Sequence, residues 1–380
     1  MIIEQLSNSI NIQKHLKALN VDSGGVAILS KKAKTHIISI KDIHVGAANI
    51  LKQDALSIGA DLAVPRGTVI AKEPSVNCIL IATTAQLQKL SKKELAQPFG
   101  LKELAKKLST IVSLKEVKTV EIMGVINAND DSFFSGSRFV NDDAVQKIES
   151  MIEDGATIID IGGVSSAPNA QSVSAQEELL RVKPILDAIK EKKLYKKVAF
   201  SIDSFEPEVI EYALASGFTL VNDITGLQDD VVCEVAAKYK AKVVIMHMQG
   251  SPQTMQDNPH YSNILDEVYN FLASQIEKAK SFGIKDIVLD VGIGFGKTLE
   301  DNIALIKNLE HFRSLGYPLL VGASRKSMID KIDPCEVSQR LGGTLAIHLE
   351  SVRNGASILR VHDVQEHAQA VKVQQALDNF

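Results

Sequence analysis

The feature that most constrains the fold is a short apolar run, rich in Val and Ile, that recurs eight times after about residue 119. Each run leads into a polar or glycine-bearing break and then a longer amphipathic segment. Near-continuous apolar runs are typical of parallel strands buried on both faces, and the intervening segments are long enough for crossover helices. The runs lie at 120–127, 156–163, 198–204, 219–226, 242–248, 286–292, 318–324 and 357–363.

This repeat predicts an α/β fold, a (β/α)8 TIM barrel that occupies residues 119–380. TIM barrels are typically about 250 residues long, which suits a segment of this length. The stretch EVIEYALASG at 208–217 has apolar residues at helical spacing and a terminal glycine suited to a C-cap, as a crossover helix should. An open, doubly wound sheet is the alternative that the pattern leaves open.

Residues 1–118 do not share the repeat, and we expect them to form a separate small α/β domain. The runs VAILS (26–30), HIISI (36–40) and NCILIATT (77–84) favour strands, and residues 92–111 favour a helix. The sequence does not indicate what this N-terminal extension does.

Composition narrows the class of partner. The net charge of -4, from 42 Lys and Arg against 46 Asp and Glu, gives no basic field for nucleic acid or a membrane surface. The N-terminal stretch lacks signal-peptide features, and no apolar run approaches the roughly 18 residues of a membrane span. Three widely separated cysteines favour neither a zinc site nor a disulfide framework. We therefore expect a cytoplasmic protein that binds small molecules.

The stretch DVGIGFGK, residues 290–297, resembles a phosphate-binding loop but lacks the spacing of one. A Walker loop would need glycine where Val291 stands, and the dinucleotide-binding form would need glycine at Lys297. The stretch also opens with Asp290, whose charge would repel a phosphate. A ligand other than phosphate is the better interpretation.

Acidic and amide side chains end three of the runs. They are Asp203, the pair Asn222 and Asp223, and Asp290. Catalytic residues of TIM barrels lie at these carboxyl ends, and buried carboxylates need donors. An aminopyrimidinone ring offers adjacent N–H groups that a carboxylate can accept. The alternative is that each Asp only caps a turn or a helix.

The last two runs end at cationic residues. Arg325 and Lys326 follow Ser324 in one, and the other holds Arg360 and His362. Arg360 and His362 lie on the same side of their strand because strand side chains alternate. The loops after the last two strands are where TIM barrels often bind phosphate, although Arg325 could simply pair with a nearby carboxylate. Together the two groups predict a flat heterocycle with a phosphate-type leaving group.

Two long polar breaks, at 127–139 and 164–174, are predicted to be mobile lids over the barrel mouth. Phe133 and Phe134 offer an apolar surface there for a second substrate. The alternative is that both breaks are ordinary loops.

These motifs resemble the dihydropteroate synthase family. The matching segments run in family order over residues 120–364. They are IMGVINANDDSFF, GATIIDIGGVSSAP, SIDSFEPEVIEYAL, VNDITG, VVIMHMQGSPQTMQ, LDVGIGFGKTLEDN, GASRKSMI, RLGGTLA and LRVHDV. The resemblance implies a cytoplasmic transferase of folate biosynthesis and a sulfonamide target. Such an enzyme condenses 6-hydroxymethyl-7,8-dihydropterin pyrophosphate with p-aminobenzoate, uses Mg2+ and forms a homodimer through barrel helices.

The resemblance also implies roles for particular residues. Lys326 and Asp203 would be catalytic, and Asn127 would bind the metal. The pterin would be bound by Asp203, Asn222, Asp290, Gly294, Phe295 and Lys326. The pyrophosphate would be bound by Asn127, Arg360 and His362. The p-aminobenzoate pocket would use Phe133, Ser166, Pro168 and Ser324.

The chain departs from the family pattern in both lids. Ala167 stands where the family usually has arginine, and the first lid lacks a usual proline. Two other functions therefore remain open. One is a methyltetrahydrofolate-dependent methyltransferase, which would have no need of the cationic residues. The other is a non-catalytic pterin-binding homologue.

Overall fold

The computed structural model describes residues 1–7, 10–114, 117–128, 138–164 and 173–379. The chain divides into two compact units. One comprises Met1–Lys115 with Gln375–Phe380, and the other comprises Glu116–Gln374. None of the described helices is long and apolar enough to cross a membrane.

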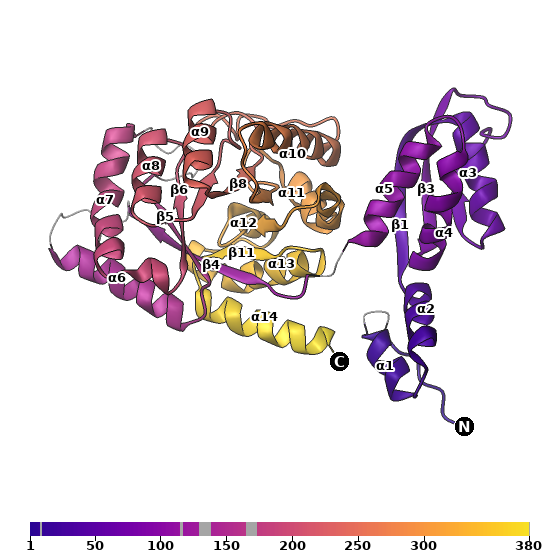
Figure 1. The fold of residues 1–380 in the computed structure, drawn as a ribbon, viewed down its shortest axis with the longest axis horizontal. Coiled ribbons are helices and arrows are strands. Elements are labelled where there is room, and N and C mark those ends of the chain that lie inside the picture. The colour runs from indigo at the N-terminus through magenta and orange to yellow at the C-terminus, as the bar shows by residue number, and fades with distance from the viewer. Residues whose placement is uncertain (8–9, 115–116, 129–137, 165–172, 380) are drawn as a thin grey trace. The chain divides into compact units, whose positions relative to one another are not determined.

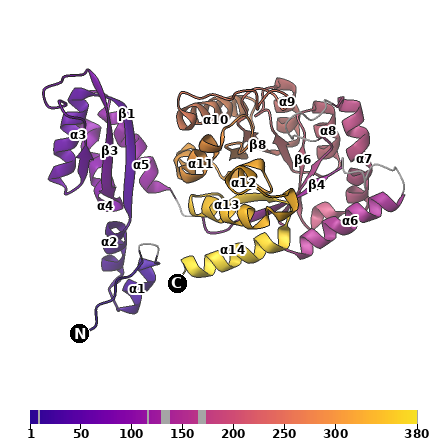
Figure 2. The same cartoon turned by 180° about the vertical axis from the view of Figure 1, so that it is seen from behind.

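The larger unit is a closed barrel of eight parallel strands surrounded by helices, which confirms the predicted TIM barrel (Figures 1 and 2). Around the barrel the order is β10-β11-β4-β5-β6-β7-β8-β9. The strands are β4 (Glu121–Asn127), β5 (Ile158–Gly162), β6 (Ala199–Asp203), β7 (Leu220–Asp223), β8 (Lys242–Met246), β9 (Ile287–Asp290), β10 (Leu319–Val321) and β11 (Ile358–Val361). Each strand falls within one of the eight runs identified in the sequence.

The barrel helices cover the outer face of the strands, where alternate strand residues such as Ile159 and Val243 join the main core. The helices are α6 (Arg138–Glu153), α7 (Ala175–Glu191), α8 (Pro207–Ala215), α9 (Asp230–Tyr239), α10 (Ile264–Ser281), α11 (Leu299–Lys307), α12 (Ser327–Ile332), α13 (Leu341–Arg353) and α14 (Val364–Asp378). Short 3-10 turns are η3 (Leu194–Lys196), η4 (Leu309–Leu315) and η5 (Val337–Gln339).

A second, smaller apolar cluster fills the interior of the barrel. It consists of Met123, Ile158, Leu220, Val244, Val288, Leu320 and Ile358. Since strand side chains alternate between the two faces, the residue two positions after each of these also points inward. That next layer contains Asp160, Asn222, Asp290 and Arg360. A polar layer therefore covers this apolar cluster on the side of the carboxyl ends of the strands.

The smaller unit is an α/β domain, as expected. Its antiparallel sheet has the order β1-β3-β2. Its elements are α1 (Ile12–Ala18), α2 (Ser23–Ala33), β1 (Thr35–His44), α3 (Val45–Ser57), β2 (Asp61–Ala63), β3 (Ser75–Thr83), α4 (Thr84–Lys93), η1 (Glu94–Ala96) and α5 (Leu101–Ser113). Residues such as Leu51, Leu80 and Leu108 form its own core.

One predicted strand of this unit is wrong. The run VAILS lies inside helix α2, whose first turn is capped by the Asp22 carboxylate accepting the N–H of Gly25 at 2.8 Å. Of the helix's residues only Val26 is buried. A short apolar run cannot distinguish strand from helix by periodicity, and here the N-cap decided the outcome. The other two predicted strands lie in β1 and β3.

Candidate active site

Arg360 is the centre of the polar layer. Its Nε donates to Oδ2 of Asp160 at 2.7 Å, and a terminal nitrogen donates to Oδ2 of Asp203 at 2.6 Å. The amide of Asn222 also donates to Oδ2 of Asp160, at 3.0 Å. Four strands, β5, β6, β7 and β11, therefore join through one buried network.

The charges of this network do not cancel. Burial opposes the charge of Arg360, but Asp160 and Asp203 outweigh it and raise the pKa of the guanidinium. Burial raises the pKa of Asp203 to about 7 although Arg360 opposes the shift, and the second carboxylate, Asp160, raises it further. Oδ1 of Asp160 is buried and has no hydrogen-bond partner among the described residues. The network thus retains an unused acceptor.

Asp160 was missed in the sequence, where only the last residues of each apolar run were considered. Its signal was its position two residues after Ile158, on the inner face of β5. Arg360, expected at an anion site beside His362, pairs in this structure with the carboxylates of Asp160 and Asp203.

Asp290 ends β9 and is 6% exposed. One of its carboxylate oxygens accepts the N–H of Gly292 at 2.7 Å, and burial raises its pKa. Gly292 has a positive φ of 69°, and a Cβ there would lie 1.9 Å from the carbonyl oxygen of His247. Only glycine fits this position, so the turn that presents Asp290 depends on it.

The remainder of the DVGIGFGK stretch packs around two lysines. Lys326 donates to the carbonyl oxygen of Ile293, and its Nζ lies 4.0 Å from the ring centroid of Phe295. Gly294 is favoured here too, because its φ of 82° is one that other residues rarely adopt, and a Cβ would lie 2.9 Å from the Lys326 Cδ. Burial lowers the pKa of Lys326 to about 7, with Asp290 opposing the shift.

Lys297 is turned into the protein and makes no phosphate cradle. Its Nζ lies 3.0 Å from Nδ1 of His247 and donates to the carbonyl oxygens of His247 and Phe295 at 3.2 and 2.9 Å. Burial lowers the pKa of Lys297 to about 7 and, with the charge of Lys297, that of His247 to about 3. The sequence excludes a nucleotide loop here by its glycine spacing and indicates no role for Lys297.

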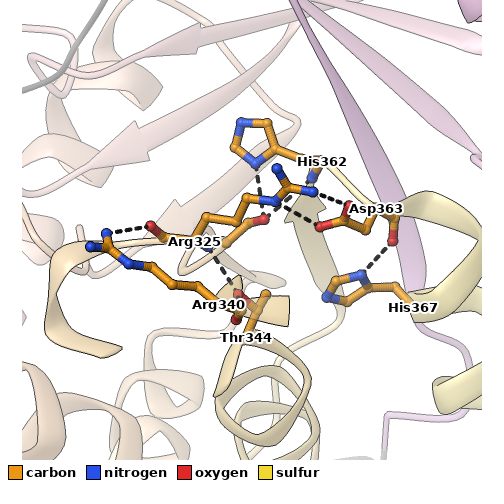
Figure 3. A network of polar contacts seen from close by, with 7 residues as sticks. Arg325, Arg340, Thr344, His362, Asp363 and His367 are labelled. Carbon is orange, nitrogen blue, oxygen red and sulfur yellow. Dashed lines mark hydrogen bonds and ion pairs between the residues drawn. The ribbon is translucent and has the colours of Figure 1, made fainter. Parts of the chain in front are cut away.

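Side chains on the loops after β10 and β11 contact one another (Figure 3). Nδ1 of His362 lies 2.9 Å from Oγ of Ser324. Desolvation, with the charges of Arg360 and Arg325, lowers the pKa of His362 to about 4. His362 is therefore neutral near pH 7, although from the sequence we grouped it with the cationic residues. Arg325 pairs with both oxygens of Asp363, at 3.0 and 2.5 Å, as the alternative interpretation had it.

Asp223 proves to be a turn residue. Its Oδ1 accepts from the backbone N–H and the hydroxyl of Thr225, both at 2.7 Å, and its Oδ2 accepts from Leu227 at 2.9 Å. Its neighbour Asn222 faces the barrel interior instead. Asn127 ends β4 and is half-buried. Phe133, Phe134, Ser166, Ala167 and Pro168 lie outside the described residues.

Comparison with known proteins agrees with this geometry. Residues 123–362 match the family described as pterin binding enzyme. The chain belongs to this family. It is 40% identical over 378 residues to a bifunctional dihydropteroate synthase/dihydropteroate reductase of Helicobacter pylori, covering 100% of this chain and 99% of the relative. The dihydropteroate synthase of Haemophilus influenzae is 44% identical over 267 residues, which cover 70% of this chain and 96% of that protein.

A solved structure supports the same conclusion. The Yersinia pestis dihydropteroate synthase, in complex with a sulfonamide drug, superposes with a TM-score of 0.65 at 37% identity. The match covers 70% of this chain and 98% of that one. The resemblance seen in the sequence is therefore confirmed, and the chain is a transferase of the dihydropteroate synthase type.

Proposed function

We propose that this protein condenses 6-hydroxymethyl-7,8-dihydropterin pyrophosphate with p-aminobenzoate to give 7,8-dihydropteroate and pyrophosphate. The observation that carries the proposal is the polar layer, in which Asp290 and the unused oxygen of Asp160 offer buried acceptors to the N–H edge of a pterin. Asn222 belongs to the same layer. The relatives that cover the barrel are named for this reaction.

We assign different side chains to the different charges that develop during this reaction. Cleavage of the C–O bond sends its electron pair to pyrophosphate and leaves positive charge on the pterin methylene. Asp203 and Asp160, which pair with Arg360, are proposed to stabilise this charge. The amine nitrogen of p-aminobenzoate then forms the C–N bond and releases a proton to solvent. Lys326, beside Phe295, places positive charge near the departing group.

The pyrophosphate end is proposed to involve Asn127, His362 and Arg360, and Arg360 would also support the pterin side through Asp160 and Asp203. The p-aminobenzoate pocket is proposed to involve Phe133, Ser166, Pro168 and Ser324. The donors suit Mg2+, because the amide oxygen of Asn127 is a hard ligand. The described residues contain no group of three His, Cys, Asp or Glu side chains that could hold a metal. A magnesium ion here would be held by Asn127, water and substrate phosphates. When bound, it neutralises charge on the leaving pyrophosphate.

The test is turnover by the full chain supplied with both substrates and Mg2+. We expect 7,8-dihydropteroate, identified by mass spectrometry, only when both substrates are present. Pterin binding without product would instead indicate a non-catalytic homologue. Methyl transfer from methyltetrahydrofolate would indicate the methyltransferase. Light scattering would test the homodimer that we propose from the resemblance, and the three free cysteines suit the cytoplasm that we propose for it.

One relative matches this chain over its whole length, and that match favours a second activity. The Helicobacter pylori protein, named for both a synthase and a dihydropteroate reductase, matches the whole chain. The family match begins only at residue 123. We propose that this chain also reduces dihydropteroate, with a reduced nicotinamide or a reduced flavin as the hydride donor. Incubation of the full chain with dihydropteroate and each donor should give tetrahydropteroate. Absence of that product with every donor would contradict the reductase activity and leave the synthase proposal intact.

A further inference from the structure

Two buried histidines link the loops after β10 and β11. His348, on α13, lies with its Nε2 3.0 Å from the backbone nitrogen of Ala323. Its Nδ1 lies 2.9 Å from Nε2 of His367, on α14. Nδ1 of His367 lies 2.5 Å from the carbonyl oxygen of Asp363. His348 is 0% exposed and His367 is 1% exposed.

The backbone groups at the two ends of this series of hydrogen bonds determine which ring nitrogens of the histidines carry protons. A backbone N–H can only donate, so Nε2 of His348 accepts from Ala323. His348 must then carry its proton on Nδ1 and donate it to His367. A carbonyl oxygen can only accept, so His367 also carries its proton on Nδ1. Both rings are neutral, and all four of their nitrogens are used.

Two further side chains, toward the N-terminal end of α13, form hydrogen bonds with the loop after β10 (Figure 3). Arg340 donates to the carbonyl oxygen of Arg325 at 3.1 Å. Thr344 accepts the N–H of Arg325 at 3.0 Å. Arg340, Thr344 and His348 are spaced four residues apart and so lie along one helix face. Arg325 has a positive φ of 57°, which a non-glycine residue adopts only when its surroundings impose it.

The groups that this arrangement holds are those nearest the proposed pyrophosphate end. Ala323 directly precedes Ser324, Arg325 and Lys326. Asp363 directly follows His362 and also binds the Arg325 guanidinium. The hydrogen-bond chain therefore sets the separation between the loop that carries Lys326 and the loop that carries His362. The acceptors Asp160, Asn222 and Asp290 lie on other strands, outside the chain of histidines.

We propose that His348 and His367 are positioning residues that hold the Ser324–Lys326 loop at the correct distance from His362 for binding the pyrophosphate end of the substrate. This inference rests on the proposed synthase function. Neither histidine touches the substrate. Their effect should therefore appear in recognition of the phosphorylated substrate rather than of the pterin ring.

Steady-state kinetics of full-length variants test the inference. H348L keeps similar volume but removes both hydrogen bonds. H348Q can still accept from Ala323 with its oxygen and donate to His367 with its nitrogen. S351A, on the same helix, is the control, since the buried Ser351 hydroxyl donates, among the described residues, only to the carbonyl oxygen of Ile347. H348L should raise the KM for the pterin pyrophosphate about tenfold while kcat falls less than about threefold. H348Q and S351A should stay within about threefold of wild type.

Two further measurements separate this role from a general loss of structure. Affinity of H348L for a pterin without phosphates should stay within about twofold of wild type. Nitrogen-15 NMR of the wild-type protein should show both histidines protonated at Nδ1. A wild type without turnover would refute the proposed function itself. An active wild type with an unchanged KM in H348L, or equal losses for both ligands, would overturn the positioning role. If H348L does not fold, an Nε2-protonated tautomer at either ring would still overturn it.

Discussion

The two sides of the barrel mouth hold their polar groups in different ways. On the β5, β6, β7 and β9 side, Asp160, Asp203, Asn222 and Asp290 project from the strands themselves. On the β10 and β11 side, Ser324 and Lys326 lie on a loop that α13 holds through its backbone. Strand side chains inherit the rigidity of the sheet, whereas loop side chains depend on a second layer of contacts. The first side should tolerate distant substitutions, and the second should not.

Replacement of Asp290 should have the largest effect. Asp290→Asn puts an N–H group where the pterin edge needs an acceptor, and we expect about a hundredfold loss of pterin affinity, about 2.8 kcal/mol. Titration calorimetry with a pterin measures it. Asp223→Asn is the matched control, because Asp223 serves only its own turn and should lower stability without changing affinity. Affinity within about threefold of wild type for Asp290→Asn would remove Asp290 from the site.

Replacement of Arg360 and replacement of His362 should affect ligand binding differently. The two residues lie only two positions apart, with Arg360 on β11 and His362 just beyond it. Arg360→Ala frees Asp160 and Asp203 from their shared cation and should weaken a plain pterin and the pyrophosphate substrate alike, each about tenfold. His362→Ala should weaken only the pyrophosphate substrate, by about threefold to tenfold. Binding assays with both ligands make the comparison. A loss in Arg360→Ala that is confined to the pyrophosphate substrate would show that Arg360 serves the pyrophosphate end alone.

The pH dependence should come from Lys326 rather than His362. The pKa of Lys326 is lowered to about 7, so a rise from pH 6 to pH 8 removes its positive charge. The pKa of His362, about 4, lies below this window. Affinity for the pyrophosphate substrate should therefore fall about fivefold more in wild type than in Lys326→Arg, which keeps its charge. If the affinity of the two proteins depends on pH in the same way, the titrating group is another residue, for example Asp203.

Removal of the N-terminal unit should have the smallest effect on the barrel mouth. The boundary between 118 and 119 stays a prediction. A protein that begins at residue 117 contains all eight barrel strands and should bind a plain pterin within about threefold of the full chain. Circular dichroism checks the fold, and calorimetry checks the binding. If the shortened protein is unfolded while the full chain is stable, the boundary between the two domains lies elsewhere.

The side built on strands was largely predictable from the sequence, and the other side was not. Eight apolar runs with alternating faces placed Asn222 and Asp290 at strand ends, and attention to the same alternation would have found Asp160. The role of Asp223 could not be predicted, since a turn residue and a ligand look alike in sequence. His348 and His367 carry no local signal, because their partners come from loops that only the closed barrel brings together. The neutral state of His362 likewise depends on burial, which a sequence does not display.

The unused oxygen of Asp160 has a consequence for inhibitor design. A buried acceptor that lacks a donor costs on the order of 1–3 kcal/mol, and a compound that supplies the donor recovers part of that cost. A pterin mimic whose N–H group reaches this oxygen should outbind the analogue that is methylated at that nitrogen. Resistance through loss of the acceptor would be difficult, because Asp160 also neutralises Arg360 and accepts from Asn222.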